Sequence, residues 1–162
     1  MRLALYQPDI AANTGTILRL AACLGVPVDV IGPTGFDMSD RALKRAGLDY
    51  LAHVDLTRHI SFSAFDETRR AAAPPARLIL LTSHAAVPHL DFAFRPGDIL
   101  MLGRESAGVP DAVHMAVDAR IRIPMQPGLR SLNIAVASAI ALGEALRQTG
   151  GFPGPSICPQ AS

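Results

Sequence analysis

Short runs of consecutive apolar residues alternate along the chain with segments in which apolar positions recur every three or four residues. The runs predict buried strands, with a weaker one at 50–54, and their ranges are 2–6, 26–31, 50–54, 77–82, 98–102 and 121–124. The recurring positions predict helices at about 16–24, 40–46, 63–72, 111–115 and 133–147. Strands that are apolar throughout and alternate with helices are typical of a parallel sheet covered on both faces. We therefore expect an α/β fold with a mostly parallel sheet sandwiched by helices.

The length and the regular alternation of these elements predict a single domain over residues 1–150. Hydrophobic residues make up 49% of the chain, which is enough to bury one sizeable core. The remaining residues, 151–162, are rich in Gly and Pro, and we expect them to form a flexible C-terminal tail.

The stretch 120–147 combines a short apolar strand, a loop with Pro and Gly, and a long helix. The helix is apolar on nearly every face, which predicts burial in the core or in a subunit interface. Polar residues gather at its start, where free backbone N–H groups and the helix dipole favour a bound ligand. These residues are Arg130, Ser131 and Asn133.

Composition limits the class of partner. The formal net charge of +1 does not favour a strongly basic nucleic-acid binder, although it allows a local basic patch.

The two cysteines, Cys23 and Cys158, fit no metal-ligand spacing, and the histidines form no cluster with Cys or Asp, so we expect no metal. Cys23 lies in an apolar helical pattern and is predicted to be buried. The cysteine usage fits a reducing cytoplasm, and no run of about 18 apolar residues predicts a membrane span.

Polar side chains also gather in three loops that each follow a predicted strand, at residues 13–19, 103–108 and 125–133. Ligands of open α/β sheets bind beyond the carboxyl ends of the strands, so these loops form the candidate site. A purely structural interpretation stays open for each loop: Asn13 as a helix cap, Glu105 as a solvated turn residue, and the third loop as capping alone. Arg19 is harder to explain structurally, because its neighbours in the helix are apolar and its guanidinium suits a carboxylate, phosphate or ribose.

The segment 102–108, Leu-Gly-Arg-Glu-Ser-Ala-Gly, does not match three well-known glycine motifs. Ser106 is three residues after Gly103 rather than two, so the Gly-x-Ser-x-Gly elbow of serine hydrolases is excluded. A phosphate-binding P-loop would need Lys-Ser/Thr, and a dinucleotide fingerprint would need three glycines at a fixed spacing. What remains is a glycine loop that lets a ligand approach the backbone, with Glu105 directed into the site.

Taken together, the three loops resemble the three motifs of the SPOUT RNA methyltransferases in order and in spacing. The resemblance rests on Asn13-Thr14-Gly15 with Arg19, on 102–110, and on 123–125 with 130–133. Residues 45–50 and Arg58-His59 further resemble the TrmL branch. That branch methylates the ribose 2′-oxygen of the wobble nucleotide (cytidine or uridine 34) in the anticodon loop of certain tRNAs. The resemblance covers about residues 1–150 and is specific only for the three motifs together.

This resemblance implies a fold and a cofactor that the hydrophobic pattern does not predict. The family ties its C-terminal segment into a deep trefoil knot and binds S-adenosylmethionine among the knot loops. It is a homodimer whose active sites are completed across the interface, which an apolar helix after Asn133 would suit. The implied cofactor contacts are the backbone around Leu81, Gly103, Ile123 and Ser131.

The resemblance also implies catalytic roles for Asn13, Arg19, Glu105 and Asn133. Because a guanidinium stays protonated at any ordinary pH, we expect Arg19 to orient a phosphate and polarise the hydroxyl rather than act as a base. Ala135 departs from the family pattern, in which relatives often keep a polar residue. We expect contacts to the substrate RNA from Lys44, Arg45, Arg58 and Arg130.

Two other functions stay open. One is a ribosomal RNA 2′-O-methyltransferase of the same family, although such relatives commonly carry an extra N-terminal RNA-binding domain. We expect none here, because the first predicted strand starts at Arg2. The other is a non-catalytic RNA-binding or assembly factor on the same fold, against which the intact Arg19, Glu105 and Asn133 argue. A flavodoxin-like small-molecule binder does not account for the motif set.

Overall fold

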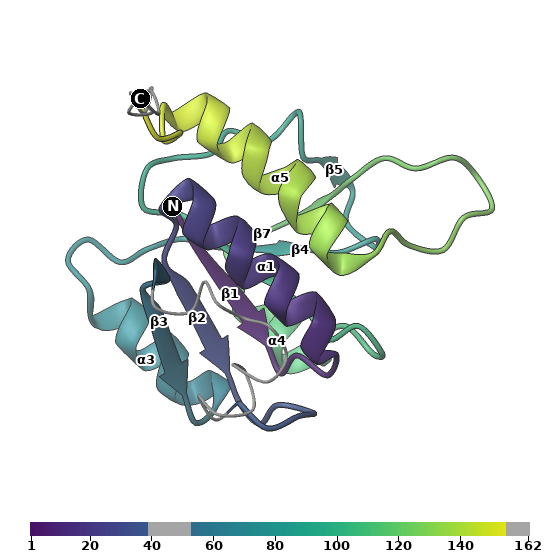
Figure 1. Ribbon diagram of the computed structural model, residues 1–162. Helices are drawn as coiled ribbons and strands as arrows, with labels where there is room; N and C mark the ends of the chain where they lie inside the picture. The colour runs from purple at the N-terminus through teal and green to yellow at the C-terminus, as the bar shows by residue number, and fades with distance from the viewer. Residues whose placement is uncertain (39–52, 155–162) are drawn as a thin grey trace, which may run out of the picture.

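The sheet of the computed structural model, which describes residues 1–38 and 53–154, has seven strands in the order β3-β2-β1-β6-β4-β7-β5 (Figure 1). Every strand pair is parallel, in agreement with the mostly parallel sheet that the sequence predicts. The strands are β1 (Arg2–Tyr6), β2 (Val28–Ile31), β3 (Leu56–His59), β4 (Leu78–Leu81), β5 (Val87–Pro88), β6 (Ile99–Leu102) and β7 (Ala119–Arg122). Because all strands run in one direction, the loops after β1, β6, β4 and β7 meet at a single edge.

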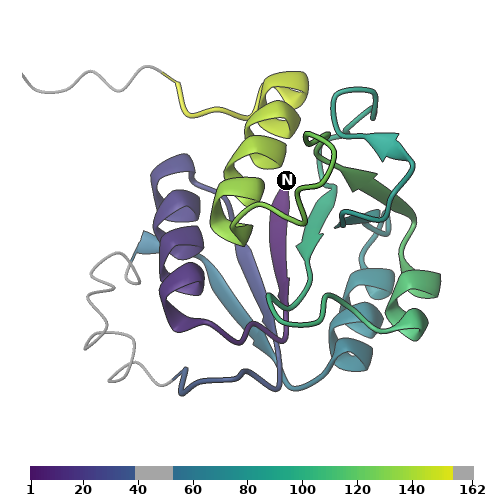
Figure 2. The ribbon, with the colours of Figure 1, turned by 90° about the vertical axis from the view of Figure 1, so that its right-hand side faces the viewer.

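Helices cover both faces of the sheet, which confirms the predicted sandwich (Figure 2). The helices α1 (Ala11–Leu24) and α5 (Ile134–Thr149) lie on one face, and α3 (Phe62–Ala71) and α4 (Asp111–Ala116) on the other. Each face has its own apolar core. Leu18 and Leu142 pack on one side, and Phe65 and Val113 on the other. Leu3, Leu100 and Leu78, which face these helices, are fully buried.

The edge strands differ most from prediction. The weak strand expected at 50–54 is wrong for its described residues, His53 and Val54, and the strand lies at β3 instead. β3 reads Leu-Thr-Arg-His and is half exposed, so it lacks the apolar run that marks buried strands. β7 begins two residues earlier than predicted, because only Ile121 of the strand is buried and the arginines beside it are exposed.

The helix starts also differ. α1 begins at Ala11 rather than at about residue 16, and its N-cap residue Ile10 makes no side-chain cap. Ser61, not Ser63, caps α3, by accepting a hydrogen bond from the backbone N–H of Ala64 at 3.2 Å. Gly25 ends α1 in the left-handed conformation (φ 65°), as predicted. The helix expected at 40–46 lies outside the described residues.

The helix α5 is apolar on most of its surface but buried on one side only. Ala141, Leu142 and Ala145 face the core, whereas Val136 and Ile140 are 50% and 40% exposed.

Cys23 on α1 is exposed, so its predicted burial is wrong: it lies on the side of the helix that faces away from the sheet. No helix in the described residues could cross a membrane. The trefoil knot and the flexible tail stay predictions.

Candidate functional site

A cavity of about 520 Å³ opens at the carboxyl ends of β4, β6 and β7. Residues from the loop after β6, from the loop between β7 and α5, and from the first turn of α1 line it. The structure thus brings together residues from all three predicted loops, together with the residues that follow β4. The predicted site residues in its lining are Asn13, Leu81, Gly103, Glu105, Ile123, Ser131 and Asn133.

Two hydrogen bonds join the three polar residues that the loops contribute to the cavity. The side-chain amide of Asn133 donates to Oδ1 of Asn13 at 3.0 Å, and the amide of Asn13 donates to Oε1 of Glu105 at 3.2 Å. These contacts connect the start of α5, the first turn of α1 and the loop after β6. The three loops therefore form one polar wall of the cavity.

The two asparagines have different local roles. Asn133 is the N-cap of α5, and its Oδ1 accepts from the backbone N–H groups of Ala135 and Val136 at 2.9 and 3.3 Å. Its amide nitrogen remains available for Asn13, so capping and site formation occur in the same residue. Asn13 lies inside α1, and the prediction that it caps the helix is wrong.

Asp9 extends the same wall through its contacts with Glu105, although it does not line the cavity, and sequence reasoning did not identify it. The backbone N–H of Asp9 donates to Oε2 of Glu105 at 3.1 Å, and the backbone N–H of Glu105 donates to Oδ1 of Asp9 at 3.2 Å. The hydroxyl of Ser106 donates to Oδ2 of Asp9. Gly35 also packs closely against Asp9, because an added Cβ would lie 2.8 Å from the Asp9 Cα. Asp9 is therefore in close contact with both Gly35 and Glu105.

The contacts between Asp9 and Glu105 change how both carboxyl groups bind protons. Burial raises the pKa of Glu105, and the neighbouring Asp9 carboxylate raises it further. Hydrogen bonding from the Glu105 side chain lowers the pKa of Asp9 to about 2, and the Ser106 hydroxyl lowers it in the same direction. A proton bound by the pair therefore resides on Glu105.

A narrow backbone turn forms the floor of the cavity. Arg104 and Gly108 exchange two backbone hydrogen bonds, each 2.9 Å from N to O. A Cβ on Gly103 would lie 2.8 Å from the carbonyl carbon of Gly108, and Gly108 has a φ of 63°, so both positions require glycine. A flat ligand can therefore come close to the exposed backbone of this turn, as we expect from the glycines in this loop.

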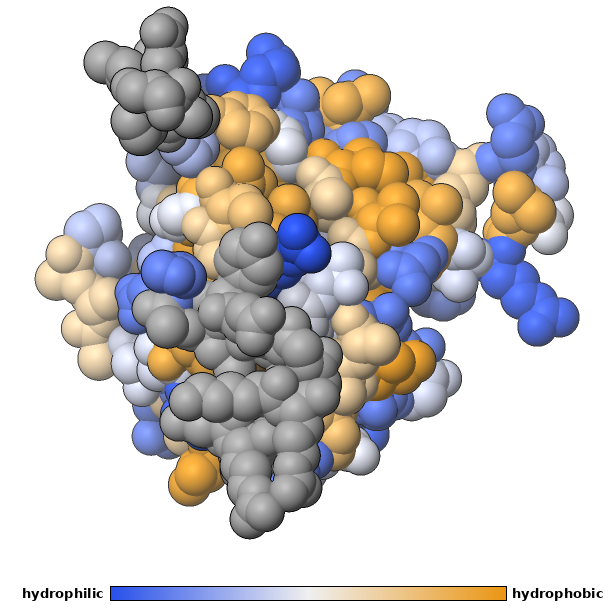
Figure 3. Space-filling view, viewed as in Figure 1, coloured by the Kyte–Doolittle hydropathy of each residue, from blue (hydrophilic) through white to orange (hydrophobic). Residues whose placement is uncertain are grey.

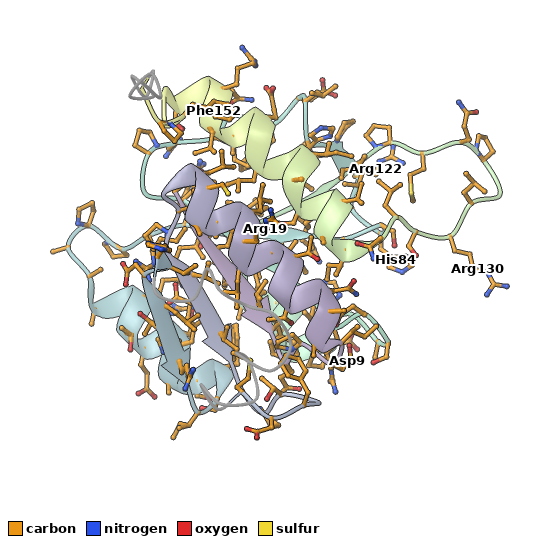
Figure 4. All side chains as sticks on the ribbon, viewed as in Figure 1. Asp9, Arg19, His84, Arg122, Arg130 and Phe152 are labelled. Atoms are coloured by element: carbon orange, nitrogen blue, oxygen red, sulfur yellow. The ribbon has the colours of Figure 1, made fainter. Side chains whose placement is uncertain are left out.

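Several predicted residues lie outside the cavity lining. Arg19 lies on the exposed side of α1, towards α5 (Figure 4). Arg130 is on the projecting 123–133 loop and points away from the body of the protein (Figure 4). Arg58 is exposed on the edge strand β3, on the other side of β1 from the cavity. Lys44 and Arg45 lie outside the described residues.

The cavity also contains residues that the sequence did not single out. Thr82, Ser83 and His84 follow β4, and His84 lies beside the start of α5 in Figure 4. Arg104 and His114 complete this group. In the described part of the chain, no group of three or more His, Cys, Asp or Glu residues could hold a metal ion.

The family model described as "SpoU rRNA Methylase family" matches residues 1–143. A protein of Beijerinckia indica subsp. indica named tRNA (cytidine(34)-2'-O)-methyltransferase is 57% identical over 164 residues, which cover 99% of each chain. A protein of the same name from Escherichia coli K12 is 41% identical and covers 95% of this chain and 96% of its own.

Solved structures show the same fold. A structure described as "Structural insights into the 2-OH methylation of C/U34 on tRNA" has a TM-score of 0.81 and 44% identity, and the match covers 91% of this chain and 94% of the other. AviRb from Streptomyces viridochromogenes, in complex with the cofactor AdoMet, has a TM-score of 0.79 and 30% identity. That match covers 91% of this chain and 60% of AviRb.

Proposed function

Because the chain belongs to the SpoU rRNA methylase family, we propose that it methylates the ribose 2′-oxygen of nucleotide 34, a cytidine or uridine, in the anticodon loop of certain tRNAs. The observation that carries this proposal is the wall in which Asn13, Glu105 and Asn133 meet at one cavity. The similarity to relatives named for this reaction extends over almost the whole chain, and it supports tRNA rather than ribosomal RNA as substrate. Such an enzyme would work in the cytoplasm, where tRNA is modified.

The methyl donor in this proposal is S-adenosylmethionine, and the cavity fits it. A side chain at Gly103 would meet the backbone of Gly108, so the backbone of this turn stays bare, as the approach of a flat adenine and ribose requires. Leu81, Ile123 and Ser131 line the same space. When bound, the sulfonium supplies an electrophilic methyl group, so the chemistry needs no metal. The protein then has to position the acceptor hydroxyl in line with the methyl group and to exclude water.

Glu105 is the group that we assign to the proton of the 2′-hydroxyl. It lines the cavity, is fixed by Asn13 and by the backbone of Asp9, and has a raised pKa. A carboxylate with a raised pKa is a better general base at neutral pH than an ordinary one. Asn13 holds the carboxylate in place, and Asn133 in turn holds Asn13 from the start of α5.

Arg19 has a different place in the proposal. It lies on the exposed side of α1, towards α5, outside the cavity lining of its own chain. Hydrophobic residues gather over α5 next to it (Figure 3), among them the half-exposed Val136 and Ile140. We assign this face to a homodimer contact, in which Arg19 of one protomer reaches the cavity of its partner and orients a phosphate beside the ribose.

RNA contacts at Lys44, Arg45, Arg58 and Arg130 belong to the same proposal. Arg58 and Arg130 are exposed, as such contacts require. A near-neutral chain fits the recognition of a small single-stranded loop, which is read through splayed bases and local contacts. Substrate affinity would then depend on a few cations rather than on a large basic surface.

Methyl transfer from labelled S-adenosylmethionine to purified tRNA, followed by nucleoside mapping, tests the reaction. We expect label on the 2′-oxygen of nucleotide 34. Label on ribosomal RNA or on a base would replace the proposed substrate. Cofactor binding without transfer to any RNA would favour a non-catalytic factor.

Mixing two inactive variants tests the shared site. Arg19→Ala and Glu105→Ala are expected to be inactive alone. If Arg19 serves the partner's cavity, a heterodimer of the two has one site with both residues intact, and random exchange restores roughly a quarter of the wild-type activity. If Arg19 acts in its own chain, every site in the mixture lacks one residue and no activity returns.

A further inference from the structure

Arg104 is the one partly buried arginine of the described chain whose guanidinium has no carboxylate partner. The other arginines of the described chain that are buried or half-buried each form an ion pair with a carboxylate. Arg2 contacts Asp29 at 2.9 Å, Arg69 contacts Asp118 at 2.9 Å, and Arg77 contacts Asp98 at 2.6 Å. In the described part of the chain, by contrast, the Nε of Arg104 is buried and has no hydrogen-bond partner. A buried donor without an acceptor is costly, so this position calls for a ligand.

The position of Arg104 is fixed by its surroundings. Its backbone is held by two hydrogen bonds to Gly108, and its guanidinium carbon lies 5.8 Å from the centre of the Tyr6 ring. A cation–π contact with an aromatic ring orients a guanidinium without using its N–H groups. The donors of Arg104 are therefore held in place and remain available.

The two nearest carboxylates along the wall are already engaged. Asp9 and Glu105 accept each other's backbone N–H groups, and Asn13 donates to Glu105. The wall thus leaves its adjacent cation for a group that comes from outside the chain. Arg104 lines the same cavity as Glu105, the residue that we assign to the reacting hydroxyl. An anion held there would lie next to the acceptor ribose.

We propose that Arg104 binds a backbone phosphate of the RNA, one of the two that flank the nucleotide to be methylated. A ribose in a chain has a phosphate on each side, and the planar fork of arginine suits a phosphate oxygen pair. This contact would set the register of the nucleotide in the cavity. The inference rests on the proposed function, because it needs an RNA substrate at this site.

Binding of an anticodon stem–loop RNA to the full-length protein, with S-adenosylhomocysteine present, tests the contact. For Arg104→Gln we expect the Kd for the RNA to rise roughly 10- to 100-fold, with an unchanged Kd for S-adenosylhomocysteine. The slope of log Kd against log salt should fall by about one. Arg104→Lys, which keeps the charge but loses the fork, should show a smaller loss. Arg95→Gln is the matched control, because Arg95 is exposed in the turn before β6, at the opposite edge of the sheet.

Neutral methylphosphonate linkages, placed one at a time on either side of nucleotide 34, identify the phosphate. At one of these two positions the linkage should weaken binding to the wild-type protein and have little further effect on Arg104→Gln, because both changes remove the same contact. Additive losses at both positions, an unchanged salt slope, or weaker binding of S-adenosylhomocysteine instead of RNA would overturn the proposal. Wild-type protein that neither binds nor methylates the RNA would overturn the proposed function as well. If the wild-type protein methylates the RNA but the Arg104 variants bind it as tightly as wild type, the proposed contact is overturned and the proposed function is unaffected.

Discussion

The wall that runs from Asp9 through Glu105 and Asn13 to Asn133 is tied by side-chain hydrogen bonds. The loop on the other side of the cavity, residues 123–132, makes one hydrogen bond in the described structure, between the backbone N–H of Leu129 and the carbonyl of Gln126. Figure 1 shows this loop projecting from the body. Both line one cavity, but only the wall is held in a fixed geometry without a ligand.

This difference separates two kinds of work. Groups that must be in place when a bond is formed act best when they are already fixed. A loop that closes on a ligand loses conformational entropy on binding, and that loss lowers affinity rather than the rate of the chemical step. We therefore expect changes in the wall to lower kcat, and changes in the loop to raise the Kd for the cofactor.

Removal of the Glu105 carboxylate should have the largest effect. Glu105→Gln keeps the shape but cannot accept the 2′-hydroxyl proton, so we expect kcat to fall by roughly 10²-fold or more. Single-turnover methyl transfer at saturating tRNA measures this, and Glu67→Gln, exposed on α3, is the matched control. A Kd for the cofactor that rises in proportion to the loss of rate would contradict the assignment.

Two changes at Asn133 separate its roles. Asn133→Ala removes the cap of α5 and the bond to Asn13, and should lower the free energy of unfolding by about 1 kcal/mol. Asn133→Asp keeps a capping oxygen but cannot donate to Asn13, so it should lower kcat at nearly unchanged stability. Chemical denaturation and single-turnover rates measure the two effects. Equal stability losses in both variants would show that the bond to Asn13, not the cap, stabilises the helix.

Asp9→Asn should shift the pH dependence of the reaction. The Asp9 carboxylate raises the pKa of Glu105, so its removal lowers that pKa. Glu105 would then lose its proton at lower pH, and the acidic limb of the kcat/KM profile should move to lower pH. The profile of Asp91→Asn, an exposed residue in the loop before β6, should match that of the wild type. If the acidic limb of the Asp9→Asn profile stays at the wild-type pH, the ionisation of Glu105 does not determine that limb.

A change at the exposed end of the loop should have the smallest effect. Leu129 is 68% exposed, so Leu129→Ser should change the free energy of unfolding by less than about 0.5 kcal/mol. Its effect should be confined to the Kd for S-adenosylhomocysteine, measured by calorimetry. A loss of kcat at saturating cofactor would show that this loop also takes part in the chemical step.

The parts of the site found from sequence were those marked by local pattern. Asn13, Glu105 and Asn133 follow strands, and parallel strands bring such residues to one edge. Asp9 also follows a strand, but it is read locally as a turn residue, and its contact with Glu105 joins residues 96 apart. Nothing within a short window of sequence encodes that pairing.

The fold shows the same limit. Buried strands were predicted within a few residues, whereas β3 was missed because an edge strand does not need an apolar run. The placement of Arg19 on the outer side of α1 was likewise not encoded in the helical pattern, which showed only that an arginine interrupts an apolar helix. The family resemblance, not periodicity, is the source of the knot and the cofactor.

The sheet order has a consequence for synthesis. β1 is paired with β2, which follows it closely, but its other neighbour is β6, nearly a hundred residues later. A growing chain can pair β1 with β2, and β2 with β3, while the second edge of β1 stays open, and such edges favour association with other chains. Asn133 is synthesised later still, so a nascent chain that ends before it lacks part of the wall. The cavity assembles only after nearly the whole polypeptide has been made, and unfinished chains would have no site for cofactor or RNA.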